Sequence, residues 1–163
     1  MRLALLLMTV GGSVAQSSVV PALSVAGVTP DLPLVLTVFV ALRRGPEIGC
    51  IAGFLAGFLQ DVAGGGLIGV QALTKALAGF AMGLLVGRFS VSNPLVQVPG
   101  LVLLTVAEGL ARFFLLQFFH YPVSFGGLMA HVVLPQALYN GFVGAACVLV
   151  VEGAEFARKQ GWA

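Results

Sequence analysis

Apolar residues occur along this chain in six long stretches, which are separated by short segments rich in proline, glycine and charge. Such stretches are typical of transmembrane helices, since a perpendicular crossing of the bilayer takes about 20 residues. The second and third stretches are short, so they either cross with help from their flanks or form a re-entrant pair. The six stretches are Leu3–Val20, Leu32–Leu42, Glu47–Gln60, Leu67–Val86, Leu95–Phe119 and Gly126–Val151.

The basic residues favour six full crossings. If the N-terminus is cytoplasmic and every stretch crosses, six of the eight Lys and Arg residues lie on the cytoplasmic side. The outer loops, near residues 21–31, 61–66 and 120–125, then contain no Lys or Arg, as the positive-inside rule requires. Ser13-Val14-Ala15 resembles a signal-peptide cleavage site, but apolar character continues to Val20, which favours an anchor. We therefore predict that both termini are cytoplasmic, together with the basic residues Arg2, Arg43, Arg44, Arg88, Arg158 and Lys159.

Composition agrees with a membrane protein and narrows the function. Of the 163 residues, 59% are hydrophobic and only 9% are charged, whereas a soluble domain carries about 25% charged residues. The chain is therefore predicted to be an all-α integral membrane protein with one polytopic domain, 1–163. A net charge of +2 without a basic patch argues against nucleic acid as a partner. No catalytic set, metal-ligand spacing or phosphate loop is recognisable, so neither catalysis nor a cofactor is predicted.

Two predicted helices carry glycine at every fourth position, so each has a bare stripe along one face. The third stretch carries Gly45, Gly49, Gly53 and Gly57, and Asp61 continues the series. Such stripes let helix backbones approach closely. The stripe Gly49–Asp61 is therefore either an internal packing surface or a groove for a partner's helix. The fourth stretch repeats the pattern with Lys75, Gly79, Gly83 and Gly87.

Lys75, Glu108, Arg112 and His131 lie well inside the predicted spans, away from their ends. Charges at membrane depth are costly and mark either pairing or function. Counted from the outer helix ends, Lys75 and Glu108 lie at depths of roughly 12 and 16 Å, so we expect them to pair across helices. Glu108 also precedes Arg112 by four residues, the favourable order for a pair within one helix. We predict an intramembrane polar cluster that also includes His131, which lies near the depth of Arg112.

Two further carboxylates, Asp31 and Asp61, are placed at outer helix ends. Asp31 is suited to cap the second helix, because aspartate is a good N-cap and Pro33 is tolerated in the first turn. We interpret both carboxylates as structural.

Several short motifs resemble the MreD family of rod shape-determining membrane proteins. The resemblance covers residues 30–87 closely and 134–141 well. It rests on Pro30 and Asp31 before the second helix, and on Pro135, Tyr139 and Asn140 near the end. Between them stand Ala41-Leu42-Arg43-Arg44-Gly45-Pro46, Gly53-Phe54, Gly57-Phe58-Leu59-Gln60-Asp61, Gly69 and Leu77-Ala78-Gly79-Phe80.

The resemblance implies a non-catalytic scaffold in the bacterial inner membrane. The expected partner is MreC, a bitopic protein, in association with the RodA glycosyltransferase, a class B penicillin-binding protein and MreB filaments. Such a scaffold would help to organise peptidoglycan synthesis and rod shape. The family's fold is similar to the substrate-binding component of energy-coupling-factor vitamin transporters, so such a transport component is the alternative function.

Overall fold

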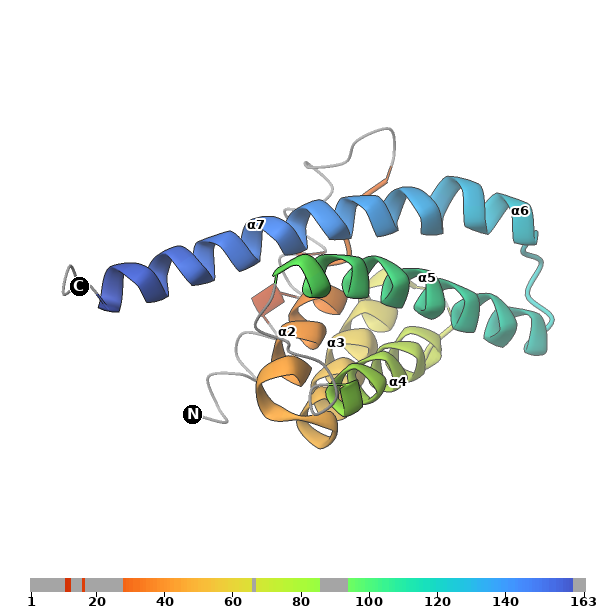
Figure 1. The fold of residues 1–163 in the computed structure, drawn as a ribbon. Coiled ribbons are helices and arrows are strands. Elements are labelled where there is room, and N and C mark those ends of the chain that lie inside the picture. The colour runs from red at the N-terminus through yellow and green to blue at the C-terminus, as the bar shows by residue number, and fades with distance from the viewer. Residues whose placement is uncertain (1–10, 13–15, 17–27, 66, 86–93, 160–163) are drawn as a thin grey trace.

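The computed structural model describes residues 11–12, 16, 28–65, 67–85 and 94–159, and these residues form an all-helical bundle (Figure 1). The first apolar stretch, Leu3–Val20, lies mostly outside the described residues, as do Arg2 and Arg88. The other five stretches coincide with helices. These are α2 (Leu32–Arg44), α3 (Pro46–Gly64), α4 (Val70–Leu85), α5 (Pro94–Phe118), and a long last helix composed of α6 (Phe125–Leu128), η2 (Met129–Val133) and α7 (Leu134–Lys159).

Helix α2 begins where the sequence predicts it. Asp31 caps it by accepting a hydrogen bond from the backbone N–H of Leu34 at 3.0 Å, and Pro33 lies in the first turn. Gly45 then separates α2 from α3 with a φ of 85°, a conformation that favours glycine. Arg43 and Arg44 are exposed at this end of the bundle.

Helices α3 and α4 form a close antiparallel hairpin. The turn between them contains Gly65 and Gly69, with φ values of 64° and 101°. Asp61 is buried and accepts hydrogen bonds from the backbone N–H groups of Gly69, Gln71 and Ala72, at 2.8 to 3.1 Å. These donors belong to the start of α4 and have no partner within that helix. The carboxylate therefore ties the end of α3 to the start of α4.

Helices α5 and α7 run side by side along one side of the α2–α4 group (Figure 1). The last helix is widened over η2, where the Leu134 N–H donates to the carbonyl of Met129, five residues earlier. Pro135 accounts for this local π-geometry, because proline has no N–H for the carbonyl four residues before it, and its ring clashes with that carbonyl.

Three of the described helical segments are long and apolar enough to cross a membrane: Pro46–Gly64, Gln97–Phe118 and Phe125–Val150. Segment α3 is longer than the apolar stretch Glu47–Gln60, because the helix continues through Asp61 to Gly64. Helix α4 is apolar but shorter, and α2 has 13 residues. Large apolar side chains such as Phe54, Leu103 and Phe142 point outward, as expected of a surface that faces lipid.

Candidate functional site: a buried polar cluster

A cluster of charged and polar side chains lies at the junction of α2, α4, α5 and α7. We use the name polar cluster for Asp31, Thr74, Lys75, Thr105, Glu108, Arg112 and Asn140. Lys75 is at its centre and is fully buried, which is rare for lysine unless it is paired.

Lys75 has three polar neighbours. Its Nζ lies 2.7 Å from Oδ2 of Asp31 and 3.6 Å from Oε1 of Glu108. The same atom donates to Oε1 of Gln71, one turn earlier on α4, at 2.8 Å. The sequence predicts Glu108 as the partner across helices, and the structure places Asp31 closer. Asp31 is both the cap of α2 and the nearest carboxylate to Lys75, and its place before α2 in the sequence indicates only the first role.

Glu108, on α5, contacts side chains of α4 and also Arg112, one turn later on α5. Its Oε2 lies 2.7 Å from Nη2 of Arg112, and its Oε1 accepts a hydrogen bond from the Thr74 hydroxyl at 2.8 Å. Glu108 thus engages both Lys75 and Arg112, which the sequence offered as alternatives. Within the ion-pair chain Asp31–Lys75–Glu108–Arg112, two positive charges balance two negative ones.

Asn140 joins three helices and is fully buried. Its Oδ1 accepts the backbone N–H of Asp31 at 2.7 Å, and its Nδ2 donates to the hydroxyl of Thr105 at 3.2 Å. One turn earlier on α7, Gln136 donates to the carbonyl of Thr29 at 3.2 Å. The family motif near the end of the chain therefore holds the residues that precede α2.

The other sequence-predicted residues lie outside the polar cluster. His131 is exposed on η2, and none of the ion pairs or hydrogen bonds described for the cluster involves it. Tyr139 and Pro135 are half-buried on α7, and Pro30 is buried next to Asp31. Within the described ranges, no group of three His, Cys, Asp or Glu side chains could hold a metal ion.

The glycine stripe of α3 faces α4 along its length. A Cβ atom added at Gly53 would collide with the backbone carbonyl of Lys75, and one at Gly57 would collide with that of Gln71. At Gly49 the obstacles are the Gly79 carbonyl and the Ala41 side chain, both 2.6 Å away. This face of α3 is thus occupied by α4 and, at one end, by α2.

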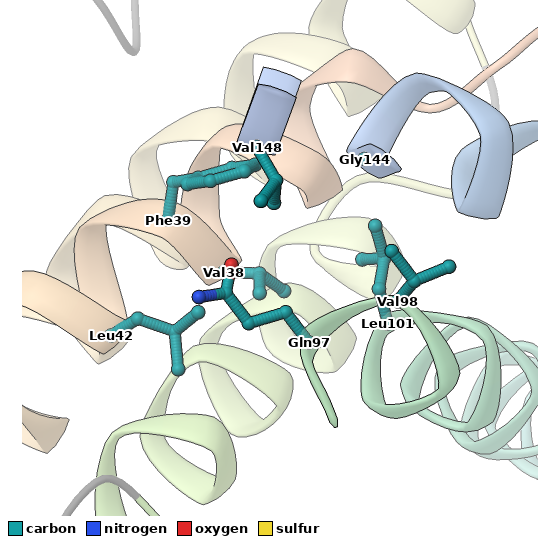
Figure 2. A pocket seen from close by; sticks show the side chains of 8 residues that line it. All are labelled: Val38, Phe39, Leu42, Gln97, Val98, Leu101, Gly144 and Val148. Carbon is teal, nitrogen blue, oxygen red and sulfur yellow. The ribbon is translucent and has the colours of Figure 1, made fainter. Parts of the chain in front are cut away.

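A small cavity lies between α2, α5 and α7, next to the apolar side chains of Val38 and Leu101. Side chains from the three helices surround it, with Leu42, Gln97 and Val148 among them (Figure 2). Its volume is about 10 Å³, which is close to the minimum for one water molecule. It has no room for a small-molecule ligand.

The polar cluster joins α2, α4, α5 and α7 through ion pairs and hydrogen bonds. The family model described as rod shape-determining protein MreD matches residues 1–159. The chain belongs to the MreD family. Searches of curated proteins and of solved structures gave no match. Membership of the MreD family means that this membrane protein has a role in the determination of rod shape.

Proposed function

We propose that this protein is a non-catalytic scaffold in the bacterial inner membrane, and that it holds the transmembrane helix of an MreC-like bitopic protein. Through this partner it acts with RodA, a class B penicillin-binding protein and MreB filaments, and helps to organise peptidoglycan synthesis during elongation. The family match over residues 1–159 is the observation that carries the proposal. A junction built from neutralised charge and backbone contacts supports a scaffold, because it fixes the positions of helices.

In this proposal the glycine stripe of α3 is an internal surface that packs against α2 and α4. Gly49, Gly53 and Gly57 contact α2 or α4, so we propose that the partner's helix binds a different face. The close contact along the stripe and the hydrogen bonds of Asp61 would then stabilise the arrangement of the helices that form that face.

The first experiment is capture of the partner from membranes. The full chain carries an affinity tag and is co-expressed with the MreC-like protein of the same bacterium, and depletion of the chain is followed by microscopy. We expect co-purification of the two proteins and loss of rod shape on depletion. If no MreC-like protein is captured and cells keep their shape, the scaffold proposal fails. Capture of an ATPase-bearing transport module with a bound vitamin would favour the transport component instead.

We also propose six crossings with both termini cytoplasmic, in an arrangement similar to the vitamin-transporter component. Exposed Arg43 and Arg44 in the last turn of α2 support this orientation. Arg44→Cys and Gly126→Cys, each in a chain without Cys50 and Cys147, compare the two ends of the bundle. A membrane-impermeant maleimide should label only position 126 in whole cells. Labelling at position 44 from outside would refute the proposed topology.

A further inference from the structure

Five large aromatic side chains are exposed where α5 ends and α6 begins, at the right-hand end of the bundle in Figure 1. Each of them is between 47% and 75% exposed. Residues 113–151 contain no Lys, Arg, Asp or Glu, so no charged side chain solvates this end. An exposed apolar patch of this kind marks a surface that meets lipid or protein. We use the name aromatic tip for Phe114, Phe118, Phe119, Tyr121 and Phe125.

The aromatic tip lies about one hydrocarbon thickness away from the turn between α2 and α3. Gly83 of α4 lies against Pro46 in that turn, and Thr74, nine residues earlier on α4, donates to Glu108 of α5. These nine residues rise about 14 Å, and the ten residues from Glu108 to Phe118 rise about 15 Å more. The two steps together nearly equal the roughly 30 Å of bilayer hydrocarbon, and a helix tilt of about 20° shortens them by only about 2 Å. The exposed arginines of α2 and the aromatic tip are therefore spaced as the two interfaces of a bilayer are.

The turn that carries the aromatic tip satisfies much of its own backbone. The N–H groups of Phe119, His120 and Tyr121 donate to carbonyls in the last turn of α5, at 2.9 to 3.1 Å. The Gln117 side chain donates to a carbonyl of the turn at 3.1 Å, and the Ser124 side chain caps α6. An unpaired backbone group is costly where water is scarce. A turn that bonds to itself is thus suited to the boundary between headgroups and hydrocarbon.

The other turn on this side of the bundle, between α3 and α4, has no such rings. Helix α3 rises about 27 Å from Pro46 to Gly64, so it ends at a similar distance from the turn between α2 and α3. Residues 62–69 contain no Phe, Tyr or Trp. The rings are therefore concentrated at one of the two turns, and the need for apolar spans does not by itself account for them.

We propose that the aromatic tip binds the interfacial layer of the bilayer and anchors the ends of α5 and α6 in one leaflet. The phenylalanine rings insert among the first carbons of the acyl chains. The Tyr121 hydroxyl and the His120 imidazole remain at the headgroups, since tyrosine and histidine have an apolar body and a polar end. The proposed topology is used only to name this leaflet as the outer one, and the identity of the protein partner is not used.

The first test measures the depth of a tryptophan placed at the aromatic tip. Trp162→Phe removes the native tryptophan, and Phe118→Trp or Leu73→Trp then adds one. Leu73 is the mid-membrane control, because it is 46% exposed on α4 and lies about 15 Å from the turn between α2 and α3. The full chain is reconstituted in phosphatidylcholine vesicles whose acyl chains carry bromine either near the glycerol or near the chain end.

Quenching of the tryptophan fluorescence then reports its depth. We expect Phe118→Trp to be quenched at least about twofold more strongly by the shallow bromine, and Leu73→Trp by the deep one, because the two sites differ in depth by about half of the hydrocarbon thickness. Equal depths for the two variants would overturn the proposal. Quenching of Phe118→Trp mainly by aqueous acrylamide would place the tip in water. Resistance to all three quenchers would show that protein, such as a second copy of the chain, covers the tip. Either result would also overturn lipid binding.

A second measurement keeps the native membrane and its proteins. A photo-cross-linking amino acid replaces Phe118 in the full chain, and the products of irradiation are identified by mass spectrometry. We expect lipid adducts as the main product at position 118. A main adduct with another protein would show that the aromatic tip is a docking surface for protein, and would refute the lipid anchor. Neither result bears on whether an MreC-like partner is captured, so the two proposals fail separately.

Discussion

The contact between α3 and α4 differs in kind from the junction that joins α2 and α4 to α5 and α7. At the glycine positions of α3 no side chain separates α3 from α4, so the backbones themselves are in contact, as at Gly53 and Lys75. Across the junction, side chains carry the contacts through ion pairs and hydrogen bonds. The first contact tolerates no added volume, and the second tolerates no unbalanced charge. Close packing thus fixes one helix pair, while paired charges fix how that pair meets the rest of the bundle.

The largest loss of stability is expected when a bulky side chain is introduced into the α3–α4 contact. Gly53→Leu would drive a side chain into the Lys75 carbonyl, so the helices must separate or the hairpin must unfold. We expect loss of the monodisperse monomer in detergent, measured by size-exclusion chromatography and thermal unfolding. Gly64→Leu is the matched control, because a Cβ at Gly64 meets no atom within 4 Å. If both variants behaved like wild type, the stripe would not be a close backbone contact.

The second largest loss of stability is expected when a charge in the polar cluster is left without its partner. Lys75→Met removes the central cation and leaves Asp31 buried without its ion-pair partner, at a cost of roughly 3–5 kcal/mol. Adding Asp31→Asn should restore more stability than adding Glu108→Gln, because Glu108 keeps Arg112. Unfolding free energies of the single and double variants give the two coupling energies. Additive losses in both cycles would show that the charges are not coupled.

The same two regions show what the sequence could and could not predict. Glycine at every fourth position identifies a face from local geometry alone, so the α3–α4 hairpin follows from spacing. The contact between Asp31 and Asn140 joins residues 109 positions apart, and no local pattern encodes which helices meet. His131 illustrates a second limit. Counting residues gives its depth near that of Arg112, but depth does not give direction, and His131 points outward on η2.

A moderate loss of stability is expected from replacing Asn140, which is part of the polar cluster and does not touch the glycine stripe. Asn140→Ala leaves the Asp31 N–H without its partner, while the Thr105 hydroxyl loses one donor and keeps its bond to the Leu101 carbonyl. A buried polar group left unsatisfied costs about 1–3 kcal/mol, so the midpoint of thermal unfolding should fall. Alanine has a higher helix propensity than asparagine, so a loss of stability would report the missing contacts and not a weaker helix. Unchanged stability of Asn140→Ala would mean that Asn140 does not hold α2 to α7.

The smallest effect is expected at Thr74, and it separates hydrogen bonding from charge within the same junction. Thr74→Val keeps the shape of the side chain but removes the hydroxyl that donates to Glu108. Glu108 retains Lys75 and Arg112, so no charge is left unbalanced, and we expect a loss of about 1–2 kcal/mol. The loss should be larger in an Arg112→Met background, because Thr74 is then one of fewer groups that stabilise the carboxylate. Chemical denaturation of the four proteins measures this dependence. An equal loss in both backgrounds would show that Thr74 and Arg112 act independently, and that the junction is a set of separate contacts instead of one charge-balanced network.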